Sequence, residues 1–267
     1  MSKQQLHIIK IGGNVIDNSE NLHHFLKDFT ALDGYKILVH GGGKVATQLS
    51  ETLGIEPKLV DGRRITDIET LRVVTMVYGG LINKNVVAQL QRFGTNAIGL
   101  TGADGNFIRT KKRPVKTIDY GFVGDIDESS IDPKSIGKLL EAGFTPVFCA
   151  ITHDGDGQLL NTNADTIASA VAVAMSKIYE TTLIYCFEKK GVLMDIDDEA
   201  SLIKEIDPTG YEELKERKVI HSGMLPKLDN AFTAINCGVK AVIIGHAADL
   251  GQIRDKQTFG TRLSNKK

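Results

Sequence analysis

The chain has 267 residues, of which 42% are hydrophobic, and its 32 Lys and Arg residues nearly balance 33 Asp and Glu residues. A chain of this length can bury a substantial core, as one large domain or two lobes, which excludes a disordered protein. The balanced charge gives no overall attraction to nucleic acid or to an anionic membrane, so any anion site must be local.

Three cysteines lie scattered in apolar contexts without a C-x-x-C pair. This usage is typical of reduced thiols rather than of disulfides or metal ligands. The N-terminus shows no secretory signal, and no apolar run approaches the ~20 residues of a membrane helix. We therefore expect a cytoplasmic protein with no membrane partner, no nucleic-acid partner and no metal-ligand cluster of its own.

Short continuous apolar runs alternate along the chain with amphipathic stretches. Continuous runs are typical of strands covered on both faces, so the pattern predicts an α/β fold, a three-layer αβα sandwich with a mostly parallel central sheet. In chain order the predicted elements are strand 6–11, helix 21–31, strand 36–40, helices 44–53 and 67–92, strand 97–101, helix 133–142, strand 145–151, helix 164–176, strand 182–187, helices 208–217 and 225–237, and strand 240–245.

Two stretches interrupt this alternation, residues 105–126 and residues 152–161. Glycines between short β-like arms predict hairpins at the sheet edge in both. The basic cluster at 111–114 has no interleaved aromatic residues, which favours a solvated hairpin edge over a nucleic-acid site. No linker divides the chain, and we expect two lobes that share one sheet, 1–180 and 181–267.

Glycine-rich turns follow the first two predicted strands. Gly12 and Gly13 come after strand 6–11, and three glycines at 41–43 come after strand 36–40. Ligands of α/β sheets bind beyond the carboxyl ends of the strands, where backbone N–H groups without side chains approach an anion closely. The third glycine is followed by "KV", which fits neither a Walker A loop nor a dinucleotide fingerprint. The two turns with Lys10 predict an anion site of another kind, although turns also need glycine for structural reasons alone.

Six motifs occur in the order found in the amino acid kinase family: "KIGGN", "VHGGGK", "DGRRITD", "GFVGDI", "LLNTNADTIAS" and "SGMLPKL". The chain resembles this family over nearly its whole length, and in particular its acetylglutamate kinase branch. The resemblance implies the amino acid kinase fold, a homodimer, and in-line transfer of a phosphoryl group from ATP with Mg²⁺ to the γ-carboxylate of an N-acyl-L-glutamate, the second step of arginine biosynthesis. Such a reaction depends on positioning and electrostatic stabilisation.

The resemblance implies catalytic roles for Lys10, Lys227 and Asp165. The two lysines match those that stabilise the charge of the transferring phosphoryl group, and the aspartate matches the one that organises both lysines. Structural alternatives stay open for each: a strand-end lysine that extends to solvent, an exposed lysine in a first helical turn, and an aspartate that caps helix 164–176.

The substrate residues follow from the same resemblance. Arg64 and Asn161 would hold the α-carboxylate of the amino acid, and Asn163 lies beside them in the motif. Arg64 also has an independent argument, because a guanidinium fork binds a carboxylate through two hydrogen bonds. Asn161 and Asn163 are equally suited to be turn and cap residues.

The acceptor γ-carboxylate would lie against the N–H groups of Gly42 and Gly43, and Val123 matches a residue that lines the acyl pocket. Arg63 stands where acetylglutamate kinases usually carry an apolar residue. We hypothesise that Arg63 binds a carboxylate on the acyl arm, which would make N-succinyl-L-glutamate the preferred acceptor. The alternative is an arginine that points to solvent or to a surface acid.

The nucleotide would lie over the lobe 181–267, on the turns "FEKKGV" and "HSGM" and against the first glycine turn, with Mg²⁺ held mainly by phosphates and water. The turn after strand 182–187 departs from the Asp-Val-x-Gly common in the family, and a serine replaces a common glycine in "HSGM". The candidate nucleotide contacts are Gly12, Gly13, Glu188, Lys190, Gly191, His221, Ser222 and Gly223.

Other functions stay open. Glutamate, aspartate and uridylate kinases belong to the same family, and the chain could also be a nucleotide or amino-acid sensor without turnover. The two lysines and Asp165 argue against a sensor, while Arg64 with Asn161 favours an amino acid acceptor. The apolar stripe of helix 67–92 fits the implied homodimer.

Overall fold

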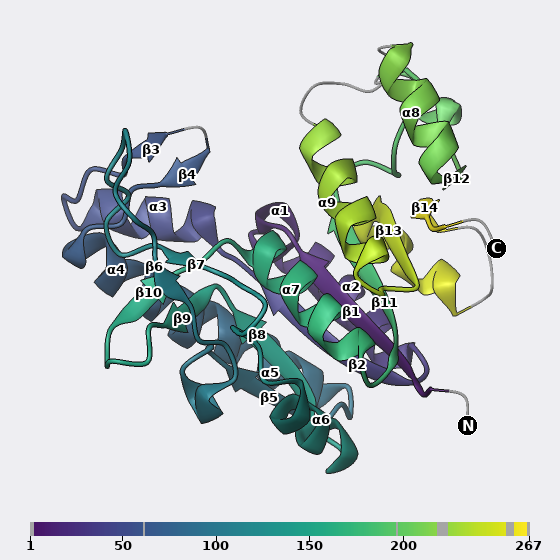
Figure 1. The fold of residues 1–267 in the computed structure, drawn as a ribbon. Coiled ribbons are helices and arrows are strands. Elements are labelled where there is room, and N and C mark those ends of the chain that lie inside the picture. Colours follow the sequence, from purple (N-terminus) through teal and green to yellow (C-terminus); the bar gives the residue numbers. More distant parts are fainter. Residues whose placement is uncertain (1–2, 61, 196, 218–223, 255–258, 266–267) are drawn as a thin grey trace.

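The computed structural model describes residues 3–60, 62–195, 197–217, 224–254 and 259–265. Its centre is a single eight-stranded sheet with helices on both faces (Figure 1). Neighbouring strands are parallel, except that β13 and β14 are antiparallel. Across the sheet the strands run in the order β12(Glu205–Ile206), β14(Thr261–Leu263), β13(Ala241–His246), β11(Glu180–Phe187), β1(Gln5–Ile11), β2(Tyr35–His40), β8(Thr145–Cys149) and β5(Ala97–Leu100).

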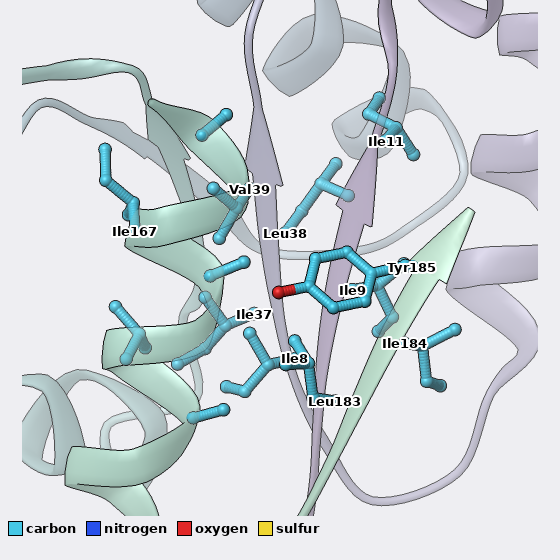
Figure 2. Packing of buried hydrophobic residues seen from close by; sticks show 14 of the residues in the cluster. Ile8, Ile9, Ile11, Ile37, Leu38, Val39, Ile167, Leu183, Ile184 and Tyr185 are labelled. Carbon is cyan, nitrogen blue, oxygen red and sulfur yellow. The ribbon is translucent and has the colours of Figure 1, made fainter. Parts of the chain in front are cut away.

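The strand β1 lies at the centre of this sheet, between β11 and β2. Its Ile8 and Ile9 are fully buried although they point to opposite faces, as expected for a strand covered on both sides. Figure 2 shows Ile8 on the side of the helix that carries Ile167, and Tyr185 of β11 on the same side. All six predicted strands of the central sheet are confirmed.

Helices form the two outer layers. On one face α6, α7 and α9 pack side by side, with α7 against β1, β2 and β11; on the other face α2 contacts α5 and η4. Small alanine side chains let α7 approach the sheet closely. The helices are α1(Gly13–Ile16), α2(Ser19–Ala31), α3(Gly43–Thr52), α4(Ile68–Thr75), α5(Asn83–Arg92), α6(Pro133–Glu141), α7(Ala164–Ser176), α8(Pro208–Glu216) and α9(Leu225–Asn236), with the short turns η2(Asp104–Asn106), η3(Glu199–Ser201) and η4(Ala247–Ile253).

The predicted helix 67–92 is continuous but changes its hydrogen-bond pattern in the middle. Between α4 and α5 the segment η1(Met76–Ile82) is π-helical. Two consecutive glycines at its centre weaken the α-helical preference there. Wide π turns are frequent at functional sites, and this one places Tyr78 and Ile82 against the glycine turn at 41–43.

Three small hairpins decorate the edge of the sheet. The pairs β9(Ile151–His153) with β10(Leu159–Asn161) and β6(Lys111–Lys112) with β7(Gly124–Asp125) confirm the two predicted hairpins. A third pair, β3(Leu59–Val60) with β4(Arg63–Arg64), has no counterpart in the prediction because each arm is only two residues long. Among the helices of the described ranges, none has both the length and the apolarity to cross a bilayer.

All strands that begin at or after residue 180 lie on one side of β1, and β2, β8 and β5 lie on the other. The division into lobes 1–180 and 181–267 stays a prediction.

Candidate active site

The two glycine turns and the turn after β11 meet at one edge of the sheet. In register, Ile11 of β1 lies between Cys186 of β11 and His40 of β2, so these three parallel strands end side by side. Each then leaves the sheet through a turn, at 12–13, 41–43 and 188–191 respectively. The structure thus brings the predicted anion-binding turns together at the carboxyl ends of the strands.

Lys10 does not extend to solvent. Its side chain is only 11% exposed, and its Nζ atom lies 2.7 Å from Oδ1 of Asp165. Asp165 stands in the first turn of α7, but the residue that caps this helix is Asn163, whose side chain accepts a hydrogen bond from the backbone N–H of Thr166. The carboxylate of Asp165 is therefore left to interact with the lysine.

Lys227 approaches the same place from α9. It is the third residue of α9, and its Nζ lies 3.8 Å from the centroid of the Phe187 ring, while Lys10 Nζ lies 5.4 Å from that centroid. Burial lowers the pKa of Lys227, nearby Asp165 raises it, and Lys10 lowers it further. Two ammonium groups and one carboxylate thus converge beside an aromatic face.

Two cavities adjoin this cluster, and Gly12, Gly13 and Gly43 line both of them. The first has a volume of about 590 Å³ and is lined by Lys10, Gly12, Gly13, Gly41, Gly42, Gly43, Arg63, Arg64, Tyr78, Val123, Asn161, Asn163 and Asp165, among others. The second has a volume of about 490 Å³ and is lined by Gly12, Gly13, Asn14, Val15, Gly43, Lys44, Cys186, Phe187, Glu188, Lys189, Gly191, Met224, Lys227 and Ile244. One of the two lysines faces each cavity, so the arrangement can hold two ligands that meet at the glycine turns.

Arg64 is held rigidly at the wall of the first cavity. Its Nη2 donates to the Gly43 carbonyl at 2.9 Å and to Thr47 Oγ1 at 2.7 Å. Its Nη1 is buried and has no partner among the described residues. A buried cationic donor without a partner is costly, so this nitrogen is ready to bind an anion in the cavity. Tyr78 stands beside it, with a phenol whose pKa is raised by burial.

The predicted substrate residues of the β10 region also reach the first cavity. Asn161 donates through Nδ2 to Thr66 Oγ1 at 3.0 Å, which orients its amide. Val123 pairs with Asn161 through a β-bridge, and it is only 8% exposed. Asn163 combines its capping role with a place in the cavity wall.

Gly42 is required by its surroundings. Its φ of 148° is strained for any residue with a side chain, and a Cβ atom there would collide with Ile82 and Tyr78 of the π-helical segment. Gly43 has open space around it, and α3 begins there.

The nucleotide candidates divide into three groups. Gly12, Gly13, Glu188 and Gly191 line the second cavity. Lys190 does not line it: its ammonium forms an ion pair with Glu199 at 2.9 Å, and the adjacent Lys189 takes the place expected for it. His221, Ser222 and Gly223 lie outside the described residues.

Sequence reasoning missed several residues of the site. Phe187, Tyr78 and Lys44 line the cavities. Phe187 and Tyr78 carry apolar ring surface and cannot be separated from core residues by pattern. Lys44 gave a signal, because a basic residue in the first turn of a helix is disfavoured unless an anion lies near. Within the described ranges, no three His, Cys, Asp or Glu side chains gather to form a metal site.

Comparison with known proteins identifies the family of the chain. The sequence profile of the amino acid kinase family matches residues 5–246. The acetylglutamate kinase of Cytophaga hutchinsonii is 59% identical over 262 residues, covering 97% of this chain and 98% of the relative. The acetylglutamate kinase of Parabacteroides distasonis is 53% identical over 256 residues, covering 96% and 100%.

Among solved structures, the N-acetylglutamate synthase of Neisseria gonorrhoeae superposes with a TM-score of 0.81 at 21% identity, covering 100% of this chain and 61% of that one. This likeness concerns the fold alone. Fold, converging lysines and a profile match over most of the chain lead to one conclusion: the chain belongs to the amino acid kinase family.

Proposed function

We propose that the chain is an ATP-dependent kinase that phosphorylates the γ-carboxylate of an N-acyl-L-glutamate, the second step of arginine biosynthesis. The proposal is supported by relatives named acetylglutamate kinase that match at 53 and 59% identity over nearly their full length. The observation that carries it is the convergence of Lys10 and Lys227 on Asp165, at the junction of the two cavities.

The first cavity suits the acyl amino acid. The unpartnered Nη1 of Arg64 and the amide of Asn161 would bind its α-carboxylate, and the N–H groups of Gly42 and Gly43 would bind its γ-carboxylate. The second cavity suits the nucleotide, with its phosphates directed to the glycine turn at 12–13.

Transfer needs little proton chemistry, because the acceptor carboxylate is already ionised at neutral pH. Its oxygen attacks the γ-phosphorus while the bond to the β-phosphate oxygen breaks, giving an acyl phosphate and ADP. In this scheme Lys10 and Lys227 neutralise the charge on the migrating group, and Asp165 fixes the position of Lys10 and attracts Lys227. Mg²⁺ would arrive with the nucleotide and be held mainly by its phosphates and by water.

An ADP-release assay coupled to hydroxylamine trapping of the acyl phosphate tests the proposal. Turnover with N-acyl-L-glutamates, and none with glutamate, aspartate or uridylate, is the expected result. Turnover with one of those three would assign another activity of the family. Nucleotide binding without turnover on any acceptor would support the sensor alternative.

We further propose that the acyl arm carries a second carboxylate, as in N-succinyl-L-glutamate. Arg63 lines the first cavity, and it also lines a neighbouring cavity of about 460 Å³ together with Arg113 and Lys116. Arg113 is neutralised by Asp125, whose Oδ1 lies 2.6 Å from its Nη2. Arg63 forms no ion pair with any residue that the structure describes, so its charge is available to the acyl arm.

Kinetics with both acceptors decide between the acyl groups. We expect the wild type to have a higher kcat/KM for the succinyl compound than for the acetyl compound. Arg63→Ala should lower kcat/KM for the succinyl compound alone by about 10- to 100-fold, because it removes a hydrogen bond between charged groups. Arg92→Ala, an exposed arginine at the end of α5, serves as control. Higher kcat/KM for the acetyl compound, unchanged in Arg63→Ala, would leave Arg63 as a solvated side chain.

A homodimer and a cytoplasmic location complete the proposal. Ile68, Met76 and Leu81 of the α4–η1 segment are 44, 53 and 55% exposed, which is unusual for large apolar side chains on one continuous helix. Burial against a second copy would explain them. Light scattering should give twice the mass of one chain, and Leu81→Glu should halve it; cell fractionation tests the location.

A further inference from the structure

We propose that His40 is a positioning residue for phosphoryl transfer: as a neutral imidazole protonated on Nδ1, it holds the Gly41 carbonyl and thereby aims the Gly42 N–H into the first cavity. The proposal rests on the function proposed above. It concerns a buried side chain that does not itself reach the ligands.

His40 is the last residue of β2 and is completely buried. Its Nδ1 lies 2.8 Å from the Gly41 carbonyl oxygen, and its Nε2 lies 3.1 Å from Nδ2 of Asn83. Asn83 is itself buried and is the first residue of α5, directly after the π-helical segment. Both ring nitrogens are therefore engaged, one by the glycine turn and one by the helix.

The amide of Asn83 has only one possible orientation. Its Nδ2 donates to the Val147 carbonyl at 2.9 Å, and its Oδ1 accepts from the Lys84 ammonium at 3.2 Å. A carbonyl can only accept and an ammonium can only donate, so the two ends of the amide cannot be exchanged. The atom that faces His40 Nε2 is consequently an N–H donor.

This donor determines the state of the ring. Nε2 must accept, so the proton of a neutral imidazole lies on Nδ1 and is donated to Gly41. A cationic ring would set two N–H groups against each other at Asn83. Burial lowers the pKa of His40 to about 4. The positive charge of nearby Lys84 also lowers this pKa, whereas the hydrogen bond to the Gly41 carbonyl raises it. The ring is neutral at physiological pH.

The orientation of one peptide follows from this bond. The described residues contain no cis peptide, and in a trans peptide the C=O and the next N–H point in opposite directions. Because the Gly41 carbonyl points to the buried ring, the Gly42 N–H points to the open side, where Gly41, Gly42 and Gly43 line the first cavity. A donor fixed before the substrate arrives stabilises developing charge without reorganisation.

The tautomer can be measured on the wild-type protein without any turnover. We expect ¹⁵N NMR at pH 7 to show a protonated Nδ1 and an unprotonated Nε2 for His40, assigned by loss of the signals in His40→Asn. Free histidine in water favours the opposite tautomer. A proton on Nε2, alone or with one on Nδ1, would overturn the proposal even if the enzyme is active.

Kinetics then separate positioning from a structural role. His40→Leu removes the donor, whereas His40→Asn places an amide N–H near the position of Nδ1. We expect kcat to fall roughly 10- to 100-fold in the leucine variant with KM for ATP within about threefold, and to recover most of its value in the asparagine variant. Equal kcat in wild type and both variants, or an equal loss in both, would overturn the positioning role.

The matched control is His7→Leu, at the opposite end of the neighbouring strand β1, where Nδ1 has no partner among the described residues. Its kcat should equal that of the wild type, and thermal melts should show all three variants folded. Lack of turnover in the wild type would refute the proposed function while leaving the NMR result to test the tautomer.

Discussion

The Nζ atom of Lys227 lies 3.8 Å from the centroid of the Phe187 ring, although the two residues come from different elements of the chain. The same ring lies 5.4 Å from Nζ of Lys10. The negative face of an aromatic ring attracts cations, so Phe187 offsets part of the repulsion between the two lysines.

Replacing this ring should weaken catalysis without abolishing it. Phe187→Leu keeps a side chain of apolar character but removes the cation–π contact, worth about 0.5–2 kcal/mol, so kcat/KM should fall roughly 2- to 30-fold. Phe93→Leu, a half-buried ring at the end of α5, provides the control for lost aromatic packing. A kcat/KM equal to wild type in Phe187→Leu would remove the ring from the mechanism.

The pH dependence should report Lys227. Its pKa is lowered below the ordinary value of 10.5, chiefly by burial. The proposed transfer requires the charged form of this lysine. The rate kcat/KM, which reports the free enzyme, should therefore fall as pH rises through this lowered pKa. Asp165 raises the pKa of Lys227, so Asp165→Asn should shift the alkaline limb to lower pH. A limb that stays in place or moves to higher pH in this variant would contradict the assignment.

Lys44 should contribute to nucleotide binding. It lies in the second cavity, where its ammonium donates to Asn14 Oδ1 and lies 3.9 Å from Asp17 Oδ2. Because the side chain is largely exposed, Lys44→Ala should raise KM for ATP only about two- to fivefold, with a weaker effect at high salt and none on KM for the acceptor. Lys27→Ala on α2 is the control. A rise in KM for the acceptor alone would place Lys44 in the other ligand site.

Gly42 should tolerate no side chain. Gly42→Ala combines a strained φ with a collision against Ile82 and Tyr78, so it should lower the free energy of unfolding by about 1–3 kcal/mol and greatly reduce kcat. Gly79→Ala meets only an ordinary contact with Thr101 at 3.5 Å and should be neutral or stabilising. Denaturant unfolding of both variants provides the comparison; equal stability of Gly42→Ala and wild type would refute the strain.

Much of this fold could be predicted because its signals are local. Continuous apolar runs identified the buried strands, and the glycines after the first two strands identified the sheet edge at which the two cavities lie. The π-helical segment was not predicted, because its apolar residues fit an ordinary helical pattern and its two glycines weaken the α-helical preference without specifying a π turn. Likewise β12 and β14 are too short to show a period.

The site likewise has residues that motifs in the sequence predicted and contacts that only the fold reveals. Lys10, Asp165 and Lys227 were predicted through family motifs, but their mutual distances depend on tertiary packing. Lys189 and Lys190 are adjacent lysines of one turn, and only the fold shows that Lys190 turns to Glu199 while Lys189 lines the cavity. The bond between His40 and Asn83 joins residues 43 positions apart, and no local pattern could reveal it.

The most direct test of the central claim is the rate of acyl phosphate formation in Lys10→Met and Lys227→Met, measured by hydroxylamine trapping at saturating ATP and acceptor. If both ammonium groups stabilise the migrating phosphoryl group, each variant should remain folded and lose roughly 100-fold or more in kcat. A variant of either lysine that forms acyl phosphate at the wild-type rate would contradict the account.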